Sequence, residues 1–189
     1  MSLASKIYSI KCKLYTFLVI PHILAFVLTG RGKSFKYDLL CMFGKCDIKT
    51  FISILYGKKY MRNLFYYRMG YTFFEIFSFL CPPDKTLHIM GCGKIGKRCF
   101  LQHSQNTFLN AESIGDDFYC LHNVTIGNDK IKGRPTIGNN VSIYTGAVVV
   151  GHITIGNNVT IAANAVVRNN IPNNVLVAGV PAKIVKYIK

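Results

Sequence analysis

TIGNNVSIYTGAVVVGHITIGNNVTIAANAVV, residues 136–167, decides the fold of this chain. An aliphatic residue returns at every sixth position, at Ile137, Ile143, Val149, Ile155, Ile161 and Val167. This period fits neither the 3.6-residue turn of an α-helix nor the two-residue alternation of an ordinary strand. Repeats of six residues are instead typical of a parallel β-helix, which the sequence therefore predicts.

The same period continues toward the N-terminus with two irregular steps. Its expected positions are Ile126, Cys120, Ile114, Thr107, Leu101, Ile95 and Ile89. The step from Thr107 to Ile114 has seven residues, and the step from Ile126 to Ile137 has eleven, with a polar surplus that contains glycine and proline. A polar surplus cannot pack in the core, so we expect residues 127–136 to leave the β-helix as a loop.

Three hexads make one triangular coil, so the sequence predicts which residues of successive coils are neighbours. Three consecutive coils run between Leu101, Cys120, Ile143 and Ile161. The residues two positions beyond these should form a column along one corner, namely His103, His122, Thr145 and Ala163. We expect the loop to lie near this corner. Two histidines on adjacent coils make the corner a candidate active site, because a neutral imidazole is a suitable general base near pH 7.

Residues 1–85 follow a different pattern. Aromatic and aliphatic residues recur there at helical spacings, as at Leu64, Tyr67, Tyr71 and Phe74, and the prolines near residue 83 break the pattern. We therefore expect an α+β protein. An α-helical region over 1–85 would precede a β-helix domain over 86–189, which ends in a C-terminal tail.

The apolar run from Leu14 to Leu28 is interrupted by Pro21 and His22 and flanked by basic residues. Its fifteen residues fall short of the roughly 20 that a spanning helix needs. One interpretation is a helical hairpin that packs on its own domain or on a neighbouring subunit. A signal-peptide segment or a helix at the membrane surface are alternatives, since basic flanks suit acidic lipids.

The composition is basic, with 23 lysines and arginines against 8 acidic residues and a net charge of +15. This balance favours anionic partners such as phosphorylated cofactors or acidic lipids. No nucleic-acid motif accompanies it, so nucleic acid is not an expected partner. The seven cysteines include no C-x-x-C pair, which favours reduced thiols in a cytoplasmic protein without a metal site.

The hexads, the loop and the ending VAGVPAKIV, residues 177–185, resemble the hexapeptide-repeat acyltransferases, above all the serine acetyltransferase branch. The segments KIGKRCFLQH, residues 94–103, and RNLFYYRMG, residues 62–70, extend this resemblance, which covers about residues 55–189. It implies that the β-helix is left-handed, that the protein is a homotrimer, and that acetyl-CoA lies in the groove between subunits.

The resemblance also implies roles for individual residues. His103 matches the general base of the family, and the positions that contact acetyl-CoA are Thr145, Ala163, Arg168, Lys183 and Lys186. The chain departs from the serine acetyltransferases at two places. Gln102 replaces an aspartate, and Arg134 stands where the loop of the family has its second catalytic histidine. Our hypothesis is that His122 takes over part of that histidine's role.

The expected activity is therefore acetyl-CoA-dependent O-acetyl transfer. The expected acceptor is a hydroxyl of a small-molecule or lipid-linked sugar in a surface-polysaccharide precursor. The alternatives are L-serine, as in cysteine biosynthesis, and a non-catalytic β-helix scaffold. We expect a cytoplasmic homotrimer, with a larger oligomer through the helices and peripheral contact with the inner face of the membrane as further possibilities.

Overall fold

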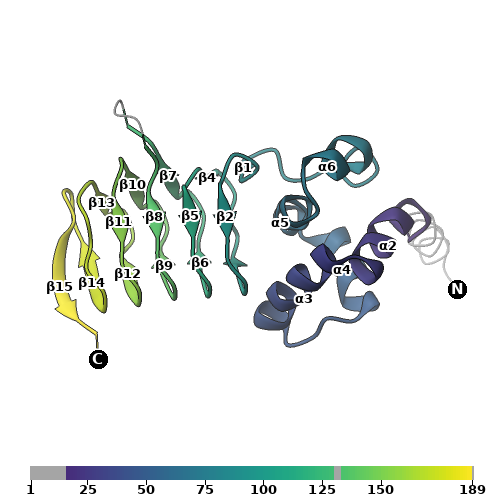
Figure 1. Cartoon of the computed structure of the whole chain (residues 1–189), viewed down its shortest axis with the longest axis horizontal. Coiled ribbons are helices and arrows are strands. Elements are labelled where there is room, and N and C mark those ends of the chain that lie inside the picture. The colour runs from purple at the N-terminus through teal and green to yellow at the C-terminus, as the bar shows by residue number, and fades with distance from the viewer. Residues whose placement is uncertain (1–15, 130–132, 189) are drawn as a thin grey trace, which may run out of the picture. The chain divides into compact units, whose positions relative to one another are not determined.

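A computed structural model describes residues 16–129 and 133–188 of the chain. The chain divides into two compact units, Met1–Pro83 and Asp84–Lys189. α-Helices build the first unit, and a parallel β-helix builds the second (Figure 1). The predicted succession of a helical region and a β-helix is confirmed.

Three sheets form the walls of the β-helix. Sheet A contains β1 (Leu87–His88), β4 (Thr107–Leu109), β7 (Thr125–Gly127), β10 (Val148–Val150) and β13 (Val166–Val167). Sheet B contains β2 (Lys94–Ile95), β5 (Ser113–Ile114), β8 (Thr136–Ile137) and β11 (Thr154–Ile155). Sheet C contains β3 (Phe100–Leu101), β6 (Tyr119–Cys120), β9 (Ser142–Ile143), β12 (Val159–Ile161), β14 (Val175–Ala178) and β15 (Lys183–Tyr187). All strand pairs are parallel except β14 with β15.

The repeating aliphatic residues form the core, as predicted. In sheet C, Leu101 pairs with Cys120, Cys120 with Ile143, Ile143 with Ile161, and Ile161 with Val177. All five side chains are fully buried. Residues before and after each of them face outward, because successive residues of a strand point to opposite faces. Each coil thus buries its core only against the coils next to it.

The Ile-Gly-Asn-Asn motif is explained by the corner between sheets B and C. At Gly138 a Cβ atom would lie 2.6 Å from the carbonyl oxygen of Gly156 in the next coil, so a side chain has no room. Asn157 then caps the turn, because its Oδ1 accepts a hydrogen bond of 2.7 Å from the backbone N–H of Asn139. The need for a glycine without a side chain and for an asparagine that caps the turn recurs once per coil, which explains why the motif recurs.

The second asparagine of the motif forms a ladder along the same corner. Asn140 donates to Asn158 at 2.9 Å, and Asn158 donates to Asn174 at 2.7 Å. All three have a positive φ, between 52° and 60°. Asparagine tolerates this left-handed conformation better than most residues, so it both makes the turn and links the coils.

One part of the predicted repeat is wrong. In sheet A the residue that pairs with Ile126 is Leu109, and Thr107 lies two positions earlier, opposite Leu87. The step that starts at Leu101 therefore has eight residues, and the next step, to Ile114, has only five. The length of the coil was predicted correctly, but its surplus lies in the corner formed by residues 102–106. Buried Thr107 begins β4 directly after this wider corner, and its hydroxyl donates to the carbonyl of Gln105 at 3.2 Å.

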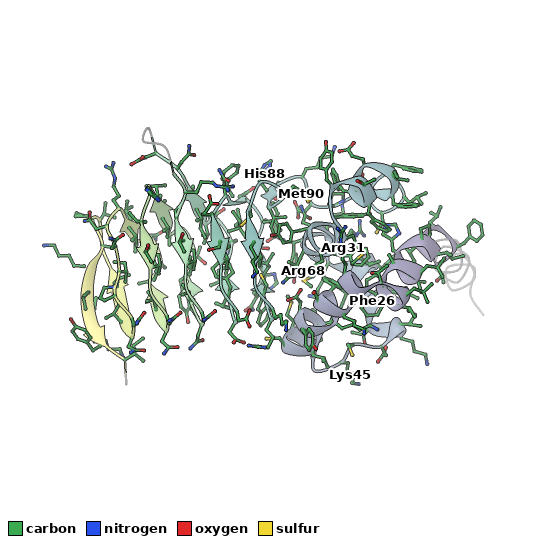
Figure 2. The ribbon with its side chains drawn as sticks, in the orientation of Figure 1. Phe26, Arg31, Lys45, Arg68, His88 and Met90 are labelled. Carbon is green, nitrogen blue, oxygen red and sulfur yellow. The ribbon has the colours of Figure 1, made fainter. Side chains whose placement is uncertain are left out.

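The helical unit contains α2 (Ile20–Leu28), α3 (Gly30–Phe43), α4 (Ile48–Gly57), α5 (Lys59–Met69) and α6 (Tyr71–Phe77). Its core is aromatic. Phe26, labelled in Figure 2, stacks on Phe51 with the ring centroids 4.2 Å apart. Phe35 and Phe65 pack edge-on against Phe51. These four rings join α2, α3, α4 and α5, and all are buried.

Two arginines of the helical unit bond to buried groups. Arg68 forms two hydrogen bonds with the fully buried Asp38, at 2.9 and 3.1 Å. Arg62 donates to the backbone carbonyls of Leu55, Tyr56 and Pro82, so it fastens the end of α4 and the segment after α6. A buried cation without such partners would cost several kcal/mol, so these contacts keep the unit folded.

The predicted apolar run is represented in the described residues by α2. Leu14 lies outside them, and α2 itself has nine residues. Pro21 occupies its first turn, where a missing backbone N–H costs nothing. Across the described part of the chain, no helix combines the length and the apolar character needed to cross a bilayer.

Candidate active site

The predicted column lies at the corner between sheets C and A, where the backbone is in register from His122 to Ala163. His103, His122, Thr145 and Ala163 each lie two residues beyond a paired core residue of sheet C. Backbone hydrogen bonds link their coils, from the N–H of Gly146 to the carbonyl of His122 at 3.2 Å and from the N–H of Asn164 to that of Thr145 at 2.9 Å. In the first coil the N–H of Asn123 donates to the carbonyl of Gln105 at 3.0 Å, so Gln105 is in register with His122 and His103 lies two residues earlier. The structure thus aligns one of the two histidines with two of the five predicted acetyl-CoA contacts.

His103 lies in the widened corner and is exposed. Its φ of 49° places it in the left-handed region, whereas on the following coils the left-handed residues of this corner come one position later, at Asn123, Gly146 and Asn164. The extra residues therefore give His103 a backbone conformation that no other column residue has. Half-buried His122 is on the next coil.

A hydrogen-bonded tyrosine holds the residue before His103. The phenol of Tyr119 donates to Oε1 of Gln102 at 2.6 Å. Burial is the main factor that raises the pKa of Tyr119, with smaller contributions from Tyr144 and Cys120, so the phenol keeps its proton. Gln102 is thus fixed in place, but it supplies no negative charge beside His103. Tyr119 and Tyr144 were not among the predicted site residues, although the register alone places them on the outer face beside the column.

Arg134 lies at another corner of the same chain. It follows sheet A and precedes sheet B, where it donates to Glu112 Oε2 at 2.8 Å, to the carbonyl of Gly91 at 2.8 Å and to Asn110 Oδ1 at 3.2 Å. The expectation that the loop lies near the histidine corner is therefore wrong within one chain, because the width of sheet A separates them. Residues 130–132 of the loop lie outside the described residues.

Arg168 lies at the same corner as Arg134, after β13. Its side chain is 63% exposed, and it forms an ion pair of 3.7 Å with Asp129. Arg134 and Arg168 thus give one corner a pair of cations, while the histidines occupy the next.

Lys183 and Lys186 lie on β15 and are exposed. The turn before β15 runs past the end of the histidine column, because the N–H of Ala182 donates to the carbonyl of Val166 at 2.8 Å and the N–H of Val166 to that of Gly179 at 3.0 Å. Gly179 itself is two residues beyond the paired core residue Val177. The lysines therefore follow directly where the column ends.

The described residues offer little support for a cysteine nucleophile or a metal site. Burial raises the pKa values of Cys92 and Cys120, so both thiols stay protonated and are poor nucleophiles. No group of three or more histidine, cysteine or acidic residues in the described ranges could hold a metal ion. An imidazole that removes a proton from a substrate is the chemistry the corner can offer.

Known proteins are similar to this chain in sequence. The family model of the bacterial transferase hexapeptide (six repeats) matches residues 134–169. The chain is 32% identical over 162 residues to WcaB of Escherichia coli K12, named for acetyl transfer in colanic acid biosynthesis, covering 84% of this chain and 97% of that protein. It is 40% identical over 97 residues to the serine acetyltransferase of Staphylococcus epidermidis, of which it covers only 46%.

Solved structures match the fold over most of the chain. The serine acetyltransferase of Neisseria gonorrhoeae matches with a TM-score of 0.69 and 25% identity, over 89% of this chain and 71% of that one. A coenzyme A complex of the Brucella abortus serine acetyltransferase matches with a TM-score of 0.67 and 24% identity, over 89% and 72%. The predicted fold, helices followed by a left-handed parallel β-helix, is confirmed.

Proposed function

Because the chain belongs to the family of bacterial hexapeptide-repeat acetyltransferases, we propose that it transfers the acetyl group of acetyl-CoA to a sugar hydroxyl in a precursor of a surface polysaccharide. The observation that carries this proposal is the corner where His122, Thr145 and Ala163 lie in register on three successive coils, with the exposed His103 on the coil before them. The chain covers nearly the whole of WcaB, whose name refers to a surface polysaccharide.

His103 is the proposed general base. Its neutral imidazole removes the proton of the acceptor hydroxyl while that oxygen attacks the thioester carbonyl of acetyl-CoA. The thiol of coenzyme A then leaves, with a proton in place of the acetyl group, and no covalent enzyme intermediate is needed. His122, on the adjacent coil, is proposed to share the acceptor. General bases of this kind contribute about 10²–10⁴-fold to a rate.

The proposed position of acetyl-CoA is along the column, from the histidines to the C-terminal lysines. Thr145 and Ala163 would contact its pantetheine arm, while Lys183 and Lys186 would neutralise its phosphates. Arg134 and Arg168 lie at the next corner, so they can reach this groove only from a second copy of the chain. This separation favours the homotrimer with shared sites that we propose.

L-Serine is the second candidate acceptor, supported by the 40% identity to a serine acetyltransferase over 97 residues. Two observations place it second. Gln102 is neutral, and the side chain of Arg134 is engaged by Glu112, so the described chain lacks the acidic neighbour and loop histidine of the serine enzymes.

The acceptor is tested by thiol release from acetyl-CoA, with L-serine compared against a panel of hexoses, N-acetylhexosamines, nucleotide sugars and lipid-linked sugars. We expect turnover with a sugar and little with serine. Turnover with serine alone would refute the sugar proposal. Sedimentation velocity on the same sample tests the trimer, and a monomer with full activity would contradict the shared sites.

We also propose a cytoplasmic location with peripheral contact to acidic membranes through the outer face of α2. Leu24 and Leu28 are 52% and 74% exposed, and Phe17, just before α2, is 69% exposed. Residues 1–83 contain twelve basic and three acidic residues, a balance that suits anionic lipid. Binding to phosphatidylglycerol vesicles, weakened by Leu28→Glu and absent with phosphatidylcholine alone, would support this contact. Equal recovery in the supernatant with both lipids would refute it.

A further inference from the structure

Aromatic rings line the outer face of sheet C beside the histidine column. The rings of Phe100 and Tyr119 are 5.4 Å apart, and those of Tyr119 and Tyr144 are 6.0 Å apart. These three residues come from β3, from β6 and from the position just after β9, so the rings cross three successive coils. Tyr144 is 41% exposed, which is unusual for a ring that could have packed inward.

The register fixes where these rings lie relative to the column. Gln102 directly precedes His103, and Tyr144 directly precedes Thr145. Both are outward neighbours of the buried residues Leu101 and Ile143, so they form the edge of sheet C that borders the column. A ligand whose hydroxyl reaches His103 would therefore lie beside this edge.

The edge combines an apolar surface with oriented polar groups. Tyr119 donates to Oε1 of Gln102, so the N–H₂ group of that amide is left to donate to a ligand. The phenol of Tyr119 can also accept a hydrogen bond, and the ring of Tyr144 presents its face or edge to solvent. Binding sites for small molecules typically combine aromatic lining with a few fixed polar groups.

We infer that Gln102, Tyr119 and Tyr144, here called the tyrosine shelf, bind the acceptor as a pyranose ring. A pyranose has a face of C–H groups that can pack on Tyr144 and a rim of hydroxyls that can bond with Gln102 and Tyr119. L-Serine has no comparable apolar face. The inference rests on the proposed O-acetyl transfer and adds the residues that select a cyclic sugar over an amino acid.

Steady-state kinetics with the most active sugar of the acceptor panel test the shelf in the full-length protein. Tyr144→Ala should raise the KM for the sugar about tenfold and leave the KM for acetyl-CoA unchanged. Tyr144→Phe, which keeps the ring, should stay close to wild type. Tyr56→Ala is the matched control, because Tyr56 is 49% exposed but belongs to the helical unit.

A second variant tests the polar part of the shelf. Gln102→Ala should raise the KM for the sugar and lower the discrimination between sugars that differ at one hydroxyl. An unchanged sugar KM in both Tyr144→Ala and Gln102→Ala would overturn the shelf while leaving sugar acetylation intact. Dissociation of the oligomer by Tyr144→Ala, with both KM values raised, would also overturn it, because the ring would then be a subunit contact.

A separate experiment covers the case in which the protein does not acetylate sugars. If wild-type protein turns over only serine, saturation-transfer NMR with methyl β-D-galactopyranoside and methyl α-D-glucopyranoside separates the two ideas. Contact of either glycoside with wild type that Tyr144→Ala abolishes supports a sugar-binding shelf without sugar turnover. Absence of contact with both glycosides overturns the shelf together with the sugar acceptor.

Discussion

Different kinds of contact stabilise the two units of this chain internally. In the β-helix, each strand pairs with the equivalent strand one coil away, and the same contacts recur at the same positions of every coil. In the helical unit, Phe26, Phe35, Phe51 and Phe65 come from four helices, and no spacing in the sequence relates them. The difference shows when neighbours in space can be counted from a sequence. They can be counted where a repeat sets the distance, and not where side-chain packing sets it.

The units also differ in where their polar side chains lie. The β-helix places most of its polar side chains at corners, where they bond to the next coil, as Asn158 does to Asn174. The helical unit buries them, as with Asp38 and Arg68 or with His22 and Tyr66. A change in the β-helix should therefore act locally, whereas a change in the helical core should act on the whole unit.

The largest expected effect is a loss of activity without a loss of fold. His103→Ala should lower kcat by about 10²–10⁴-fold, because it removes the general base. The β-helix should stay intact, since His103 is exposed. Thiol release and circular dichroism measure the two effects. His152→Ala, which removes an exposed histidine at another corner, is the control. Near-normal turnover of His103→Ala would remove His103 from the mechanism.

The next effect concerns the helical core. Phe51→Ala should destabilise the helical unit by about 3–5 kcal/mol, because its ring contacts three other buried rings and leaves a cavity. Urea unfolding followed at 222 nm measures this change. Phe79→Ala, at a ring that is 73% exposed, should cost far less. If the unfolding transition of the β-helix shifted by the same amount, the effect would not be confined to the helical unit, which would contradict the comparison.

Acid should weaken the helical unit before the β-helix. Burial lowers the pKa of His22 from 6.5 to about 4, and Arg62 adds to the effect. Between these values the unfolded chain binds more protons, so stability is complete above pH 6.5 and falls as the pH approaches 4. The slope is at most about 1.4 kcal/mol per pH unit, or on the order of 2–3 kcal/mol in all. Unfolding at pH 7 and pH 4.5 measures it, and His22→Phe should flatten the slope. The same slope in that variant would exclude His22 as its cause.

The smallest effect tests the asparagine ladder. Asn158→Ala should destabilise the β-helix by about 1–2 kcal/mol, because alanine is strained at a φ of 55° and two hydrogen bonds are lost. Asn158→Gly loses the same bonds without the strain, so it should cost less. Thermal unfolding of both variants gives the comparison. Equal losses would mean that the hydrogen bonds, and not the backbone conformation, fix the choice of asparagine.

The sequence predicted the β-helix closely because its period determines the register. The register of His122, Thr145 and Ala163 followed from counting, but Gln105 occupies the position that counting gave to His103. The position of the surplus residues could not be predicted from the repeat. Thr107 and Leu109 are both suited to a buried strand, and only the structure shows that Leu109 pairs with Ile126. The corner of Arg134 was missed for a related reason, since a loop in sequence can leave any of three corners. Tyr119 could have been found from the register, but its bond to Gln102 depends on side-chain conformation.

The last strand of the protein has a consequence for self-assembly. A stack of parallel coils ends in open strand edges, and another coil could pair with them and extend the stack. On sheet C the antiparallel strand β15 covers β14, shown in yellow in Figure 1. A further parallel coil cannot continue past a strand that runs the opposite way. β15 thus works as a stop against fibre growth, and it does so with the same residues, Lys183 and Lys186, that are proposed to hold the phosphates of the acetyl donor.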